Sequence, residues 1–412
     1  MRPESGLLSR SAISRIGFLL AAFLVMNVLF LHLGGPNEML NIPSWWDMNW
    51  IMEKHGFFRV WTPYPPVMPL ITYTGYRLLK ADPIYIAWAW RGANLVLLGL
   101  SGWLLYELTE RKRPLVPIAY LLWSMSWASL VLVGVWCDHE ENLILVLVLL
   151  ALLLLQRRHT AGASVATGLA VMTKLFPLAL VLATPRALGA KRWGRYAAGC
   201  AVVCLSVAAP FLIADPAIFL SSFRWTADRG PWESVYAFPA EPREAMPPMI
   251  FLRPGMEGLV VRSEMVEWLR SGGKKLYWEW RLTTPYERSR PFEPLTLLPI
   301  LGFLACAGLV ALSPGGSLVT RTLGVLVFLL LFSKGFSSYF ILWIVPLLFL
   351  EYGEIMGFVL GCALLLLGNL VVFALVKDSY ALFWTAIFAR HVLLCGVGLH
   401  LVLRGRGPRT AV

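Results

Sequence analysis

The chain has 412 residues, of which 58% are hydrophobic and only 15% are charged, and its mean hydropathy is +0.67. Soluble domains carry about 25% charged residues, so this composition excludes a soluble globular protein. The net charge of +12 would suit a nucleic-acid partner, but the basic residues gather in short loops between apolar runs, as in membrane proteins. We therefore expect a polytopic helical membrane protein without a nucleic-acid partner.

The N-terminal half begins with an apolar run, Ile16–Leu33, that follows several arginines, which places the N-terminus in the cytoplasm. A shorter helix opens at Pro65 and Pro66 and ends near Leu79, so it lies at the interface or re-enters the membrane. The longer apolar segments of this half are Ile16–Leu33, Ile84–Leu108, Leu115–Trp136, Leu143–Leu155 and Tyr196–Ile213.

One apolar segment of this half, Ala161–Thr184, has an unusual pattern. Lys174 and Pro177 interrupt it, and basic residues flank it on both sides, so the charge bias requires an even number of crossings. About 24 residues cannot cross twice at a rise of 1.5 Å per residue. We predict two half-helices that form a re-entrant hairpin with Lys174 near its tip, a form that needs protein or a water-filled cavity around it.

The second half follows a long polar segment from Ala214 to about Glu293, which we expect outside the cell and folded against the membrane surface. The later apolar segments are Pro294–Leu312, Leu318–Phe332, Tyr339–Leu350, Ile355–Val376 and Ala381–Leu403, with an outer loop at Ser333–Ser338. The scheme gives about ten crossings plus the hairpin, or ten to twelve transmembrane helices. It divides the chain into an N-terminal transmembrane catalytic half (1–213, first outer loop 34–66), an extracytoplasmic loop (214–293) and a C-terminal transmembrane half (294–412).

The first outer loop places a carboxylate, Asp47, among Trp45, Trp46 and Trp50. Interfacial tryptophans usually anchor a protein to the membrane surface, so the stretch fits an anchoring loop with a solvated aspartate. A carboxylate among apolar rings also pays a desolvation cost that raises its pKa. This second interpretation makes Asp47 a candidate proton acceptor.

Other ionisable residues fall on or reach toward the same outer face in this topology. Lys174 inside an apolar run is costly and therefore points to a cavity or a partner. The acidic turn Asp138–Glu141 also fits a helix N-terminal cap. Lys334 also fits a snorkelling lysine, and Arg229 with Glu233 also fits a loop ion pair.

Several common kinds of site are missing from the sequence. It has no visible Ser/His/Asp or Cys/His nucleophile set, no zinc-type Cys/His spacing, and no glycine fingerprint for a phosphate or a dinucleotide. His139 among acids suits a solvated turn better than a metal site. We expect neither a metal nor a cofactor.

Five short stretches carry a resemblance to a known family, and they follow one another in that family's order. They are Asp47 with Tyr64-Pro65-Pro66; Glu141-Asn142 before a leucine run and Gln156-Arg157-Arg158; Ala161-Gly162 through Thr173–Pro177; Arg229-Gly230 with Glu233-Ser234; and Ser333–Tyr339 leading to Trp343 and Pro346. The pattern resembles the GT-C glycosyltransferases that use a polyprenyl-phosphate sugar, most closely the GT87 mannosyltransferase-type group. Two positions depart from it, because Asp138-His139 replaces the usual Gly-Gln, and Lys334-Gly335 replaces a common Ser-Pro.

The resemblance implies a GT-C-type helical bundle with extracytoplasmic catalytic loops. It also implies that the protein transfers a sugar, with mannose as the first candidate, to a lipid- or glycan-linked acceptor with inversion. It implies that Asp47 is the catalytic base. A lipid phosphate is a good leaving group, so the reaction needs one base and cations for the phosphate charge. The candidate phosphate partners are Arg229, Lys174 and Lys334. The candidate sugar or acceptor contacts are Trp46, Tyr64, Glu141, Trp232 and Glu233.

Two other classes of function use the same polar residues. A flippase or transporter of lipid-linked glycans would need a polar path but no base, so Asp47→Asn would leave transport largely intact. A non-catalytic subunit of a cell-envelope assembly would tolerate the loss of all these residues together.

Overall fold

The structure of the chain is a computed structural model. It describes residues 10–33, 49, 53, 57, 65–79, 83–126, 141–216, 219–220, 234–238, 297–333, 335–336, 338–376 and 379–405. In this part of the chain the regular elements are all helical. Apolar runs fold this way in a membrane because only a helix or a closed barrel satisfies its own backbone groups where water is absent.

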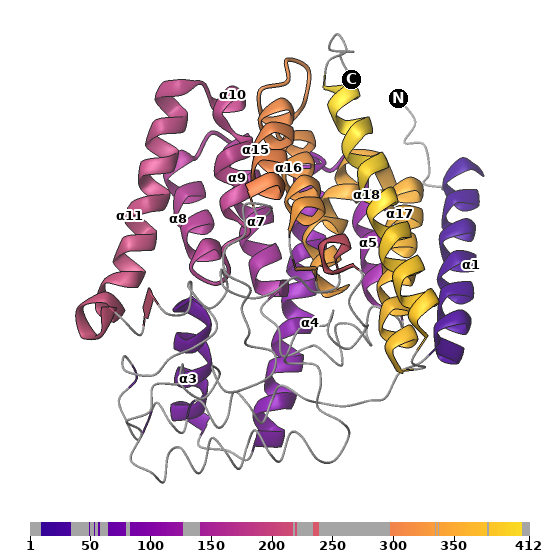
Figure 1. The fold of residues 1–412 in the computed structure, drawn as a ribbon, viewed down its shortest axis with the longest axis horizontal. Coiled ribbons are helices and arrows are strands. Elements are labelled where there is room, and N and C mark those ends of the chain that lie inside the picture. Colours follow the sequence, from indigo (N-terminus) through magenta and orange to yellow (C-terminus); the bar gives the residue numbers. More distant parts are fainter. Residues whose placement is uncertain are drawn as a thin grey trace, which may run out of the picture.

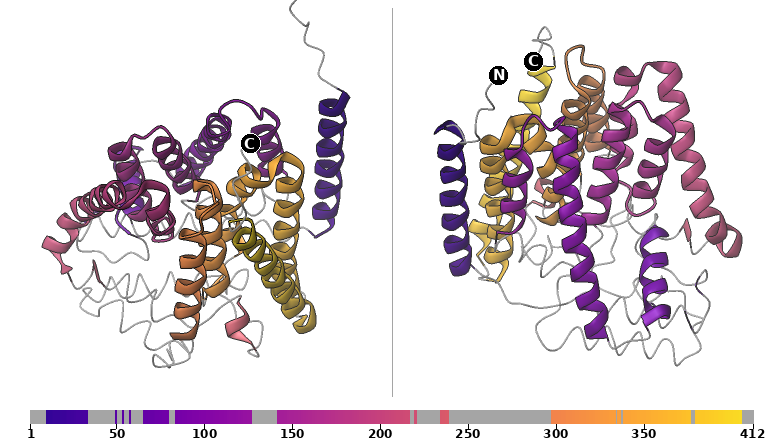
Figure 2. Two further views of the ribbon diagram at one scale, coloured as in Figure 1. Left: turned by 90° about the horizontal axis from the view of Figure 1, so that it is seen from above. Right: turned by 180° about the vertical axis from the view of Figure 1, so that it is seen from behind.

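The first half of the chain contributes nine labelled helices within the described residues (Figure 1). They are α1 (Arg10–Leu33), α3 (Val67–Leu79), α4 (Pro83–Leu108), α5 (Leu115–Ser124), α7 (Glu141–Gln156), α8 (Thr160–Val171), α9 (Leu178–Ala183), α10 (Pro185–Leu188) and α11 (Ala190–Ala214). Figure 2 shows α1 and α11 on opposite flanks of the bundle.

The second half begins with the short 3₁₀ helix η2 (Val235–Ala237). Its remaining elements are α15 (Leu297–Ala311), α16 (Leu318–Phe332), the 3₁₀ helix η5 (Ser338–Trp343), α17 (Val345–Val376) and α18 (Tyr380–Arg404). By length and composition alone, three described stretches could cross a membrane, namely α11, Val345–Val371 of α17, and α18, although the second contains a break at Gly353. The total of ten to twelve transmembrane helices stays a prediction.

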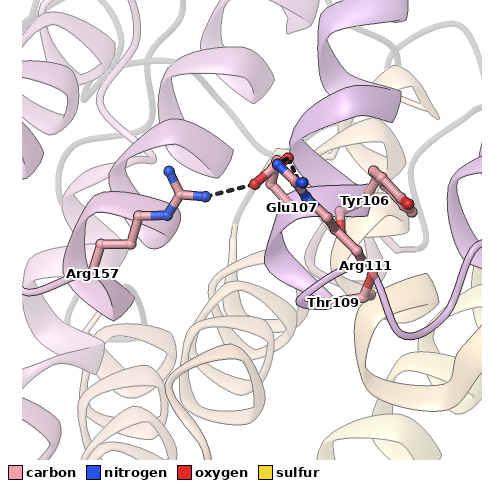
Figure 3. A network of polar contacts seen from close by, with 5 residues as sticks. All are labelled: Tyr106, Glu107, Thr109, Arg111 and Arg157. Atoms are coloured by element: carbon pink, nitrogen blue, oxygen red, sulfur yellow. Dashed lines mark hydrogen bonds and ion pairs between the residues drawn. The ribbon is translucent and has the colours of Figure 1, made fainter.

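One end of the molecule gathers most of the described arginine ion pairs, whereas the pair of Arg77 with Glu53 involves α3. The start of α1, the end of α18 and α10 lie at this end, and α3 lies at the other (Figure 1). Here Glu107 of α4 accepts hydrogen bonds from Arg111 at 2.7 Å and Arg157 at 2.5 Å (Figure 3). Two further pairs are Arg15–Glu354 at 2.6 Å and Arg404–Glu351 at 2.8 Å. We call this end the basic end; it is the one that the charge bias assigns to the cytoplasm.

The predicted re-entrant hairpin is confirmed. Helix α8 leaves the basic end, stops at Val171, and the chain returns as α9 from Leu178 to Ala183. Both ends of the hairpin stay at the basic end, since Arg192 Nε after α9 donates to Thr160 Oγ1 at the start of α8, at 3.0 Å. Twelve helical residues rise about 18 Å, which is less than the thickness of the hydrocarbon core, so each arm of the hairpin is too short to cross it.

Helix α17 also contains a reversal, at Gly353, whose φ of 82° is open mainly to glycine. A Cβ added at Gly357 would lie 2.8 Å from the Cα of Phe349. In a straight helix those residues would be about 12 Å apart. The chain therefore doubles back, which confirms the prediction of two separate segments, Tyr339–Leu350 and Ile355–Val376. The first of these starts as the 3₁₀ helix η5, which the sequence did not predict.

The predicted span Leu115–Trp136 is only partly helical. Helix α5 ends at Ser124, and the next two amide groups close the turn, with Ser126 N donating to Trp123 O at 3.1 Å. Serine hydroxyls compete with the backbone for hydrogen bonds, which weakens a helix at Ser124-Met125-Ser126. Residues 127–140 lie outside the described part, so the rest of this span is still a prediction.

Candidate functional site

The tip of the α8–α9 hairpin presents Lys174 on a short irregular turn. The amide groups of Thr173 and Lys174 both donate to Ala170 O, at 3.1 and 3.0 Å, which ends α8. Pro177 then opens α9 as its N-cap residue, a place where the missing N–H costs nothing. The turn contains no glycine. Its conformation is held by the restricted backbone of Pro177 and by the contacts that Lys174 makes.

Lys174 forms a buried ion pair with Glu141, the first residue of α7. The ammonium donates to Glu141 Oε1, and the two side chains are 16% and 2% exposed. The other carboxylate oxygen, Oε2, is buried and has no hydrogen-bond partner within the described residues. An unsatisfied buried polar atom costs about 1–3 kcal/mol, so this oxygen is a natural acceptor for a hydroxyl brought in from outside.

Three aromatic rings stack beside this ion pair. Phe176 of the tip lies on Trp343 with ring centroids 3.8 Å apart and planes at 9°, and Phe340 lies 4.1 Å from Trp343. The Lys174 ammonium is 5.4 Å from the Phe340 centroid and 5.6 Å from that of Trp343. Cation–π attraction is strongest where water is excluded, so the rings of η5 help to hold the ammonium beside them.

The first outer loop reaches the same place through α3. The Val67 amide, at the start of α3, donates to Met172 O of the hairpin tip at 3.0 Å. Asn49 is 4% exposed and accepts from Thr72 Oγ1 of α3 at 3.3 Å. Both contacts attach the described parts of the predicted catalytic loop to α3, and α3 to the tip that carries Lys174.

The loop after α16 also contacts the site. Phe336 lies 6.2 Å from Phe340 by ring centroids, and the Arg390 guanidinium of α18 lies 3.8 Å from the Phe336 centroid. The segment after the predicted Arg229–Ser234 motif packs on α18 as well, with Phe238 5.1 Å from Trp384. Stretches far apart in the sequence thus converge around the hairpin tip and α18.

Two of the predicted site residues, Lys174 and Glu141, can be placed, and the structure brings them together as one pair. The others, Asp47, Trp46, Tyr64, Arg229, Trp232, Glu233 and Lys334, lie outside the described residues. The sequence assigned Lys174 to the donor phosphate and Glu141 to the sugar or acceptor, without foreseeing that the two side chains share a hydrogen bond.

Sequence reasoning did not assign roles to the aromatic residues Phe176, Phe340 and Trp343, nor to Asn49 and Arg390. The signal for Trp343 was present, because it follows the Ser333–Tyr339 stretch that carried the resemblance. The signal for Arg390 was also present, since a charge inside an apolar run is costly at membrane depth. As for metals, no cluster of three or more His, Cys, Asp or Glu side chains occurs among the described residues.

Comparison with known families gives one match that covers most of the chain. The model of glycosyltransferase family 87 matches residues 61–333, from just before α3 to just after α16. This range contains the hairpin tip, the Lys174–Glu141 pair and α3. A comparison with curated proteins gave no match, and neither did a comparison with solved structures.

Proposed function

Since the chain belongs to glycosyltransferase family 87 and is thus a membrane glycosyltransferase, we propose that it moves a hexose from a polyprenyl-phosphate donor to an acceptor hydroxyl. Mannose is the first candidate for the sugar, and a membrane lipid or a glycan is the acceptor. Transfer takes place with inversion, on the extracytoplasmic face of the cell membrane. Neither a metal nor a cofactor takes part.

The observation that carries this proposal is the buried Lys174–Glu141 pair at the tip of a re-entrant hairpin, against the rings of η5. A cation at membrane depth suits a ligand whose charged group is attached to a lipid chain. Such a ligand keeps its polyprenyl tail in the bilayer while its phosphate reaches into the protein. A soluble nucleotide-sugar would need no cation at that depth.

Asp47 acts as the general base. Asn49, two residues later, is fixed on α3, and extended chain geometry keeps Asp47 within about 7 Å of it. Helix α3 is bonded to the hairpin tip through Val67, and this contact supports the proposal that Asp47 serves a substrate held beside Lys174.

The reaction is a single displacement. Asp47 takes the proton of the acceptor hydroxyl, and the acceptor oxygen attacks the anomeric carbon of the donor sugar. The bond between that carbon and the phosphate oxygen breaks on the opposite face, which inverts the anomeric centre. Polyprenyl phosphate leaves with the electron pair, and the proton stays on the Asp47 carboxylate until solvent removes it.

Cations stabilise the charge that develops on the leaving phosphate. Lys174 contributes one from the hairpin tip, and Arg229 and Lys334 contribute from the outer loops. The proposed sugar and acceptor contacts are Trp46, Tyr64, Glu141, Trp232 and Glu233. Among these, Glu141 offers the buried oxygen that a sugar hydroxyl can satisfy.

The test is turnover of labelled polyprenyl-phosphate-mannose by purified protein in lipid nanodiscs, with membrane lipid and glycan extracts as acceptors. Appearance of polyprenyl phosphate together with an equal amount of mannosylated acceptor supports the proposal. The same protein in sealed proteoliposomes reports on a flippase. Movement of the intact donor across the bilayer, without loss of its sugar and unchanged in Asp47→Asn, would establish the transporter instead.

A further inference from the structure

Helix α18 carries two neighbouring ionisable side chains in the middle of its apolar length. Arg390 is 0% exposed and His391 is 5% exposed, and the helix runs from Tyr380 to Arg404. A buried charge inside a spanning helix is costly and is retained mainly where it serves a site. The family match ends at residue 333, so it assigns nothing to α18.

Both side chains face the same aromatic ring, that of Phe336 from the loop between α16 and η5. The Arg390 Cζ lies 3.8 Å from the ring centroid, and the His391 ring lies 6.2 Å from it. Phe336 itself is 0% exposed. A guanidinium stacked on a ring away from water forms one of the stronger cation–π contacts, so Arg390 fixes where Phe336 lies.

The loop anchored in this way is the one that contains Lys334. The Ser333 hydroxyl donates to Gly335 O at 2.6 Å, at the start of this loop. Directly after this turn comes Phe336, which is held on α18. The described residues on either side of position 334 are therefore held in place, Ser333 and Gly335 by a hydrogen bond and Phe336 by Arg390.

The same anchor extends to Lys174 through the rings that follow. The Phe336 and Phe340 centroids are 6.2 Å apart, and Phe340 lies 5.4 Å from the Lys174 ammonium. The segment from Ser333 to Trp343 thus contacts Arg390 near one end and Lys174 near the other. Lys174, one cation of the proposed phosphate site, therefore depends on the position of this segment, and Lys334 belongs to the same segment in the sequence.

We propose that Arg390 is a positioning residue for the donor phosphate, which acts through Phe336 on the Ser333–Trp343 segment. Arg390 does not itself contact the substrate. The identity of the ligand rests on the proposed function, whereas the route from α18 through Phe336 rests on the contacts above.

The experiment measures binding of two probes, farnesyl phosphate and farnesol, to purified protein in nanodiscs. Because a desolvated cation–π contact is strong, we expect Arg390→Met to weaken farnesyl phosphate binding about five- to thirtyfold. Farnesol, which lacks the phosphate, should bind within about twofold of the parent. Arg390→Lys should recover only part of the loss, since an ammonium keeps the charge but lacks the planar group that stacks on the ring.

Phe336→Leu should reproduce the effect of Arg390→Met, and the double variant should be no worse than either single one, because both remove the contact between the guanidinium and the ring. The matched controls are Arg404→Met, at the exposed end of the same helix, and Phe328→Leu, a buried ring of α16. Both should bind the two probes like the parent. If Arg390→Met does not fold, Arg390→Lys and Phe336→Leu still carry the test.

Three results would overturn the inference while leaving the proposed function intact. They are an Arg390→Met protein that binds farnesyl phosphate like the parent, equal losses for farnesol and farnesyl phosphate, and additive losses in the double variant. A parent protein that binds farnesyl phosphate no better than farnesol would overturn the proposed function and this inference together.

Discussion

Ion pairs at the basic end and at the hairpin tip are built in opposite ways. At the basic end, the buried Glu107 carboxylate meets Arg111 and Arg157, whose side chains are 65% and 53% exposed. At the hairpin tip, Glu141 and Lys174 are 2% and 16% exposed. Water solvates one partner of each basic-end pair, whereas both partners at the tip are largely removed from it.

The surroundings of the two carboxylates differ in the same sense. Both oxygens of Glu107 accept hydrogen bonds from arginines, whereas Glu141 Oε2 accepts none within the described residues. A fully satisfied carboxylate with exposed arginines ties helices together, as Glu107 ties α4 to α7. A dry, half-satisfied pair is costly to maintain, which points to a ligand that completes it.

The largest expected effect is on turnover, from a carboxylate at the site. Asp47→Asn should lower sugar transfer by about 10² to 10⁴-fold, because the amide cannot accept the acceptor proton. Donor binding should stay near the parental value. The matched control is Glu110→Gln, an exposed carboxylate at the basic end, which should leave turnover unchanged. Near-parental turnover of Asp47→Asn in nanodiscs would remove the proposed mechanism.

The pair at the tip should come next. Lys174→Ala should weaken donor binding about ten- to a hundredfold, since a charge-assisted hydrogen bond is worth roughly 1.5–3 kcal/mol. It also leaves the buried Glu141 carboxylate without its cation, which should lower the unfolding free energy by about 3–5 kcal/mol.

The double variant Lys174→Met/Glu141→Leu separates these two effects. Apolar replacement of a whole buried pair is often neutral for stability, so the double variant should recover stability without recovering donor affinity. Chemical denaturation and donor titration are the two measurements. Recovery of donor affinity together with stability would show that Lys174 has only a structural role.

A smaller effect should come from the scaffold that joins the basic end and the hairpin tip. Gly357→Ala places a methyl group 2.8 Å from the Phe349 backbone, which should cost about 1–3 kcal/mol of stability through overpacking. Gly99→Ala in α4 meets no heavy atom within 4 Å and should be neutral or slightly stabilising. Equal melting temperatures for the two variants would contradict the reversal at Gly353.

The smallest effect should come from the basic end. Arg157→Ala removes one of two arginines from Glu107, and the exposed guanidinium loses little when it returns to water. The melting temperature should fall by no more than about 2 °C, and turnover should stay within twofold of the parent. A loss of turnover as large as that of Lys174→Ala would erase the contrast between the basic end and the hairpin tip.

Features that depend on local pattern could be predicted from the sequence. Flanking basic residues and a short apolar length were enough for the α8–α9 hairpin, since both bear directly on how often a segment can cross. The pairing of Lys174 with Glu141 could not be predicted, because they lie 33 positions apart in the sequence. A sequence separation of that size does not indicate how far apart two side chains lie in the fold. The early end of α5 was missed because hydropathy averages over Ser124 and Ser126, which favour a turn.

The salt bridge between Arg15 and Glu354 joins residues 339 positions apart. Helix α1 packs against α5 and α17, so part of its resting place is made near the end of synthesis. During insertion, α1 can contact α5 first, and it completes its packing only after α17 has entered the membrane. The earliest helix to be made is among the last to complete its contacts, and truncation anywhere before Glu354 leaves it half-packed in the lipid.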